Sequence, residues 1–198
     1  MNYGELKHNL ISKGFAEQSD LDEYEELGYL YDAINDAVDE VSVLFPLLAK
    51  YEFDIDEDET DYVYIDMTDI EGFLGFAETP VLYEKDGTET FVKFSDYEIE
   101  MDTTLVINPS GNAGSYRVYY EKECTKVDQN TPDTFQFEIP LKAHKLITPL
   151  SAYYLWLDDD ERKATQYYNL YEQTRSTVLT KEKAPRARII PDKRWGVI

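Results

Sequence analysis

The apolar residues of the chain change their spacing twice. They recur every three or four positions near the N-terminus, alternate with polar residues in the middle, and return to the wider spacing after residue 140. A period near 3.6 is typical of an amphipathic helix, and a period of two is typical of a strand. The pattern therefore predicts helices towards both ends of the chain and strands between them.

The N-terminal part is predicted to hold two helices. Asn2 and Glu5 have the spacing of a capping box, and Gly14 can end the helix that they begin. A second, longer helix is expected to run without a break from Asp20, its N-cap, to Pro46. Its apolar residues are spaced by three or four: Leu27, Leu30, Ile34, Val38, Val41 and Leu44.

Alternating apolar and polar residues predict strands in the middle of the chain. The plainest signal is a hairpin, because residues 81–84 and 90–94 flank the turn dipeptide Asp86-Gly87. Further strands are expected at residues 51–56, 62–65, 103–107, 115–121 and 135–139.

Two more helices are predicted after residue 140. The first covers residues 141–157 and contains Pro149, which kinks it or starts it afresh. The second opens with the acidic run 158–161, which complements the positive end of a helix. A short connection between two helices favours an antiparallel pair.

This order of elements predicts an α+β fold. We expect an antiparallel helical bundle from the N- and C-terminal helices, with an inserted small antiparallel β domain and an extended C-terminal arm. The helical domain is predicted to comprise residues 1–49 and 140–181, the β domain residues 50–139, and the arm residues 182–198.

Charge divides the chain unevenly. The 198 residues include 41 acidic and 19 basic ones, a net charge of −22. Residues 1–100 carry 28 acids and five bases, whereas residues 181–198 carry six bases and two acids. Such an acidic body repels phosphates and anionic lipids, so it argues against general gripping of nucleic acid or of a membrane. With 42% hydrophobic residues the chain is nevertheless apolar enough to fold.

The chemistry-bearing residues predict no catalytic, cofactor or metal site. Cys124 is the single cysteine, and His8 and His144 lie far apart in sequence, so a thiolate or imidazole metal cluster lacks ligands. The acids at 54, 56 and 58 imitate a calcium loop, but its sixth position is Glu59 and its twelfth is Ile65. We therefore expect a protein that is not an enzyme.

Other patterns bear on location and on the remaining acids. Consecutive acids at 158–161 fan out around a helix and cannot all face one cation. No stretch has the form of a signal peptide or of a membrane span, which predicts synthesis and retention in a reducing cytoplasm.

The C-terminal residues are predicted to be a docking arm. Two prolines, at 185 and 191, oppose a helix, and the apolar content exceeds that of a solubilising tail. Arginine and tryptophan are residues that anchor interfaces. The expected contacts with a partner are Arg186, Arg188, Ile189, Ile190 and Trp195.

The order of parts resembles the head–tail connector, or adaptor, proteins of tailed bacteriophages. The resemblance lies in Asn2-Tyr-Gly-Glu-Leu-Lys, in Ala33-Ile-Asn-Asp-Ala-Val-Asp-Glu-Val, in Ala152-Tyr-Tyr-Leu-Trp, in Asp159-Asp-Glu-Arg-Lys-Ala and in Tyr168-Asn-Leu-Tyr-Glu. These motifs are architectural and cover most of residues 1–180. The acidic, tyrosine-rich β part departs from the pattern, which leaves its partner open.

The resemblance implies a virion structural protein made in the cytoplasm of a bacterial host. Such proteins form a homo-oligomeric ring, usually of twelve copies, bound beneath the portal at the capsid vertex and linked to downstream neck or tail proteins. Double-stranded DNA passes through the lumen without sequence-specific binding, and no membrane is involved. By position, residues 182–198 are the arm that reaches into the portal.

Two alternatives from other classes stay open at this point. An acidic DNA mimic, which inhibits a nucleic-acid-binding enzyme, explains the charge of −22 but not the basic tail with its tryptophan. A hydrolase with a pair of catalytic carboxylates among the 41 acids is the other alternative, and a strongly perturbed pair in a deep cleft would support it.

Overall fold

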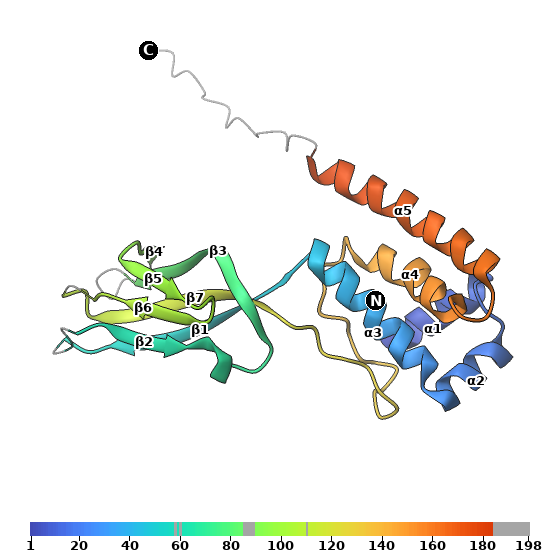
Figure 1. Cartoon of the computed structure of the whole chain (residues 1–198), viewed down its shortest axis with the longest axis horizontal. Helices are drawn as coiled ribbons and strands as arrows, with labels where there is room; N and C mark the ends of the chain where they lie inside the picture. The colour runs from blue at the N-terminus through green and yellow to red at the C-terminus, as the bar shows by residue number, and fades with distance from the viewer. Residues whose placement is uncertain (58, 60, 85–89, 110, 184–198) are drawn as a thin grey trace, which may run out of the picture.

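The computed structural model of the chain describes residues 1–57, 59, 61–84, 90–109 and 111–183. It has two lobes joined by two segments of chain (Figure 1), one leading from the helices into the strands and the other leading back. The helical lobe contains α1 (Tyr3–Ser12), α2 (Gln18–Leu27), α3 (Tyr29–Leu44), α4 (His144–Trp156) and α5 (Glu161–Lys183). The β lobe contains the strands between residues 47 and 122.

The β lobe consists of two antiparallel sheets. The first has the strand order β1-β7-β3-β4, and the second has the order β2-β6-β5. Their bounds are β1 (Leu47–Ile55), β2 (Val63–Asp66), β3 (Phe73–Glu84), β4 (Phe91–Lys93), β5 (Tyr97–Glu100), β6 (Thr104–Ile107) and β7 (Gly114–Lys122), with a short 3-10 helix at Met67–Asp69. Buried side chains from both sheets, such as Val118 and Leu105, form one core between them.

The pairing of β3 with β4, in which Leu82 lies opposite Lys93, confirms the two strands of the predicted hairpin, and the Asp86-Gly87 turn lies outside the described residues. The strand predicted at 135–139 is wrong. In that segment the backbone makes a single bridge, between Gln136 and Asn2. The reason is burial, because Phe137 and Ile139 belong to the core of the helical lobe and not to that of the sheets.

The predicted antiparallel bundle of N- and C-terminal helices is wrong. The helices flank a middle dominated by strands, and the helix expected from Asp20 to Pro46 is two helices, α2 and α3. Gly28 separates them in the left-handed region at φ 84°, where a glycine is tolerated without steric cost. Asp20 is therefore not an N-cap. It is the third residue of α2, and its carboxylate accepts from the backbone N–H of Glu17 at 2.9 Å.

An extended segment without helix contributes to the core of the helical lobe. Residues 123–143 run along the helical lobe, and Val127 is buried in its core. The Asn35 side chain on α3 donates to the Val127 carbonyl at 3.0 Å and accepts from the Val127 N–H at 2.9 Å. The N–H groups of Tyr3 and Gly4 on α1 donate to carbonyls of residues 135 and 133. The segment is thus held by side-chain hydrogen bonds at Val127 and by backbone hydrogen bonds at residues 133 and 135.

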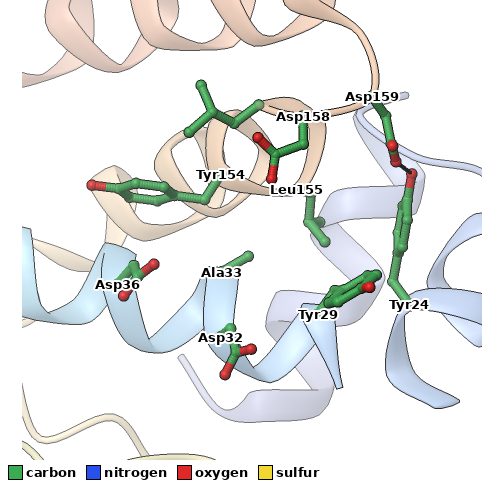
Figure 2. A pocket seen from close by; sticks show the side chains of 10 residues that line it. Tyr24, Tyr29, Asp32, Ala33, Asp36, Tyr154, Leu155, Asp158 and Asp159 are labelled. Atoms are coloured by element: carbon green, nitrogen blue, oxygen red, sulfur yellow. Dashed lines mark hydrogen bonds between the residues drawn. The ribbon is translucent and has the colours of Figure 1, made fainter. Parts of the chain in front are cut away.

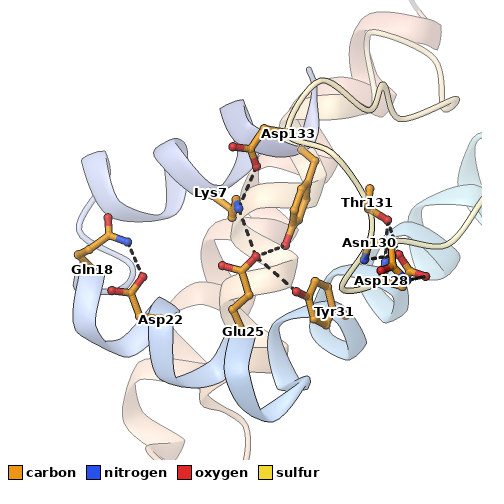
Figure 3. A network of polar contacts seen from close by, with 10 residues as sticks. Lys7, Gln18, Asp22, Glu25, Tyr31, Asp128, Asn130, Thr131 and Asp133 are labelled. Atoms are coloured by element: carbon orange, nitrogen blue, oxygen red, sulfur yellow. Dashed lines mark hydrogen bonds and ion pairs between the residues drawn. The ribbon is translucent and has the colours of Figure 1, made fainter.

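A partly buried polar network ties the N-terminal helices to this segment (Figure 3). Lys7 on α1 pairs with Asp133 at 2.9 Å and with Glu25 on α2 at 3.2 Å. The hydroxyls of Tyr3 and Tyr31 also donate to Glu25. Burial opposes the charge of Lys7, but the hydrogen bonds to Asp133 and Glu25 raise the pKa of its ammonium group overall. The capping box predicted at Asn2 and Glu5 is confirmed.

The helices of the C-terminal half lie on α3 as successive layers. Helix α4 packs against α3 on one side and against α5 on the other (Figure 1). Pro149 lies inside α4 without ending it. The core side chains of this lobe come from all five helices and from residues 124–139, so two stretches of sequence, separated by the β lobe, build it.

Candidate functional site

An acidic groove lies between the N-terminal half of α3 and the junction of α4 with α5 (Figure 2). Its volume is about 380 Å³. Four carboxylates and three tyrosines contribute to the wall, together with a few apolar side chains. The lining residues are Tyr24, Tyr29, Asp32, Ala33, Asp36, Tyr154, Leu155, Leu157, Asp158 and Asp159.

The floor and the walls of the groove follow from helix geometry. Asp32 and Asp36 are four residues apart, so they project from the same face of α3 and are both exposed. Ala33, between them, is buried against the core. Figure 2 shows these two aspartates across the groove from Tyr154 and Asp158. The small side chain of Ala33 lets α4 approach α3 while the acids remain in solvent.

The α4–α5 junction places the other two acids. Helix α4 ends at Trp156, whose indole N–H donates to the Phe15 carbonyl at 2.8 Å. The carboxylate of Asp160 accepts from the N–H groups of Arg162 and Lys163, at 3.0 and 3.2 Å, and so caps the start of α5. Asp158 and Asp159 precede this cap and reach the groove.

Two tyrosine hydroxyls beside the groove, those of Tyr24 and Tyr154, have raised pKa values and remain protonated. Tyr24 donates to Asp159 at 2.5 Å, and burial together with this carboxylate raises the pKa of the Tyr24 phenol. Tyr154 donates to Glu40 at 2.8 Å, and burial, Glu40 and Asp36 raise its pKa as well. Each phenol is therefore a neutral hydrogen-bond donor to a neighbouring carboxylate.

The groove carries negative charge that described cations do not neutralise. Within the described ranges, Asp32, Asp36 and Asp158 form no ion pair. The ammonium group of nearby Lys163 lies over the Trp156 ring, 3.4 Å from its centroid. Tyr29 and Leu157 are 57% and 45% exposed and add apolar surface beside the acids. Carboxylates next to aromatic faces suit a guanidinium group, which pairs with the former and stacks on the latter.

Of the residues considered from sequence for chemistry, Asp158 and Asp159 line the groove, whereas Cys124, His144 and Asp54 are placed in structural contacts elsewhere. Cys124 is buried in the helical core, and burial raises the pKa of its thiol. The His144 ring contacts the N-terminal amine and the Ile139 carbonyl, each at 2.9 Å. Asp54 accepts from Ser115 at 2.5 Å. In the described part of the chain, no three His, Cys, Asp or Glu residues are grouped to hold a metal ion.

The predicted arm contacts Arg186, Arg188, Ile189, Ile190 and Trp195 lie outside the described residues. Sequence reasoning missed the groove, although Asp32 and Asp36 stand at helical spacing opposite an apolar stripe. That spacing is the signal that could have found one wall. None of the helices in the described ranges combines the length and apolar character that crossing a membrane requires.

Comparison with known proteins adds no family to this description. Neither a protein-family model nor a curated protein matches the chain. The assignment of a function therefore depends on the architecture of the chain and on the resemblance in its order of parts.

Proposed function

We propose that this chain is a structural head–tail connector protein of a tailed bacteriophage. Copies of the chain assemble into a ring beneath the portal, extend the DNA channel and link the capsid to downstream neck or tail proteins. The helical lobe forms the ring, the β lobe meets the next component, and residues 182–198 attach the ring to its neighbours. The protein acts by assembly and performs no catalysis.

The observation that carries this proposal is exposed apolar surface at both ends of the α3–α4 pair. At one end, Tyr29 and Leu157 are 57% and 45% exposed; at the other, Val43 and Leu141 are 82% and 81% exposed. The Lys142 ammonium lies 4.8 Å from the Phe45 ring centroid, which sets the start of α4 beside the end of α3. A ring requires two different patches on each subunit, because its contacts are head-to-tail.

Charge supports the same role. Residues 1–46 and 123–183, which build the helical lobe, contain 21 acids and ten bases, a net charge of −11. A channel component should guide DNA without gripping it, since each phosphate contact adds salt-dependent affinity. An acidic wall repels the phosphates and leaves the DNA free to slide.

Native mass spectrometry and electron microscopy of the purified full chain, alone and mixed with the portal protein of the same virion, test the proposal. We expect closed rings with a central channel in at least one preparation, at an integer multiple of the 23.1 kDa monomer. Deletion of residues 184–198 should abolish portal binding and leave the circular dichroism of the monomer unchanged.

A protein that stays monomeric in both preparations overturns the proposal. If that monomer also displaces DNA from a DNA-binding protein, the acidic DNA mimic is the correct class. Normal binding of the truncated chain to the portal contradicts the assigned role of the C-terminal residues.

A further inference from the structure

We infer that the acidic groove is the docking site for residues 184–190 of a neighbouring copy of this chain. The inference rests on the proposed ring and names the contact that joins one subunit to the next. Asp32, Asp36 and Asp158 receive Arg186 and Arg188 of the neighbour, and Tyr29 and Leu157 cover the apolar residues that follow them.

Charge complementarity is the first argument. The groove presents four carboxylates, and its three aspartates named above form no ion pair with a described residue. Residues 184–198 contain four basic side chains and one acidic one, whereas the rest of the chain is strongly acidic. This segment is thus the part of the molecule that an acidic groove attracts most strongly.

The basic residues of the segment are of a type that suits a groove with both carboxylates and an aromatic ring. The first two cations after Lys183 are arginines, at 186 and 188, and two isoleucines follow directly. A guanidinium group forms paired hydrogen bonds with a carboxylate and stacks on an aromatic ring, which an ammonium group does less well. The groove offers both partners side by side, with Tyr29 at the start of α3 and Asp32 one turn later.

Length keeps the two arginines from the Asp158 and Asp159 wall of the groove in their own chain, so a segment that reaches this wall comes from another copy. Asp158 and Asp159 immediately precede α5, and α5 has 23 residues, so its far end lies roughly 33 Å from these two acids. Arg188 is five residues beyond that end and spans at most about 18 Å of extended chain. The two arginines therefore fall short of Asp158 and Asp159 in their own chain. A neighbour beside the groove has no such restriction.

Cysteine cross-linking between two full-length variants tests the inference. Both chains carry Cys124→Ser; one adds Asp36→Cys and the other adds Ala187→Cys. We expect a disulfide-linked dimer when the two are mixed and oxidised, and its loss at high salt because exposed ion pairs are screened. The matched control replaces Asp36→Cys by Glu98→Cys, an exposed acid on β5, and should give no dimer above the background of random collision.

Charge exchange provides a second readout. The variant Asp32→Arg/Asp36→Arg should lose self-association by at least tenfold in sedimentation experiments, and Arg186→Asp/Arg188→Asp should do the same. Mixing the two variants should restore association. The control Glu98→Lys/Glu100→Lys changes the charge by as much on the β lobe and should associate normally.

The outcomes separate the inference from the proposed function. Rings that form without the 36–187 cross-link, or that survive both charge reversals, overturn the docking site and leave the connector role standing. A cross-link found only within a single chain carrying both cysteines also overturns it. A cross-linked pair that never closes into a ring supports the docking site and contradicts the connector role.

Discussion

The two lobes build their cores in different ways. The β lobe draws its buried side chains from one continuous stretch, between Ile55 and Tyr120. The helical lobe combines α1 to α3 with the extended segment and α4 to α5. The entire β lobe lies in sequence between α3 and the extended segment. Closing the helical core thus requires that both ends of the chain meet, whereas the β core closes locally. Local contacts form with less loss of chain entropy than distant ones.

The difference indicates that the lobes respond separately to core mutations. Leu146 on α4 is fully buried in the helical lobe, and Leu146→Ala should destabilise it by about 2–5 kcal/mol. Thermal unfolding followed at 222 nm, where helices dominate, should shift to lower temperature. Hydrogen exchange in β7 should remain unchanged.

The matched variant is Val118→Ala, which removes buried volume from the β core. It should accelerate exchange in the strands and leave that of α4 as it was. Equal acceleration in both lobes after either change would mean that they unfold as one unit, and the comparison would fail.

A smaller loss is expected at the contact that fastens the extended segment. Asn35→Ala removes both hydrogen bonds to the Val127 backbone and leaves those groups without their partner, at a cost of about 1–3 kcal/mol. Faster hydrogen exchange at Val127 is the direct readout. Asn169→Ala, an exposed position on α5, is the control and should be neutral.

A substitution at Gly28 tests why the chain turns between α2 and α3. Its φ of 84° is unfavourable for any residue with a Cβ, although no heavy atom lies within 4 Å of where that Cβ would be. Gly28→Ala should therefore cost about 1 kcal/mol, through the backbone alone. Gly75→Ala in β3 also meets no neighbour and is not left-handed, so it should not destabilise. Equal urea midpoints for the two variants would contradict this explanation.

The smallest expected effect is a pH dependence of the helical lobe. Burial and the N-terminal amine lower the pKa of His144 below its value in the unfolded chain. The unfolded chain then binds a proton more readily, so this contribution to stability is complete above the unfolded pKa of about 6.5 and decreases as pH falls through it. Thermal unfolding at pH 7.5 and 5.5 should show the decrease, and His144→Gln should reduce it. His8→Gln, at an exposed position, should leave the difference as in the parent chain.

Sequence periodicity predicted the elements better than their arrangement. The capping box of α1, the β3–β4 hairpin and the start of α5 after an acidic run all depend on contacts within a few residues. The break at Gly28 was missed because the apolar spacing of α2 and α3 continues across it. The groove was missed because Asp32 and Asp158 come together only when α4 packs on α3.

The sequence by itself determined the helix–strand–helix order, the acidic body and the basic C-terminal residues, since each depends on local composition or spacing. Only the tertiary structure decided that residues 123–143 pack as an extended segment, that the strands form two sheets around one core, and that four aspartates share a groove. The physical reason is the range of the interactions. Hydrogen bonds within a turn or a hairpin leave a signal in neighbouring residues, whereas burial between distant segments depends on which faces meet in the folded chain.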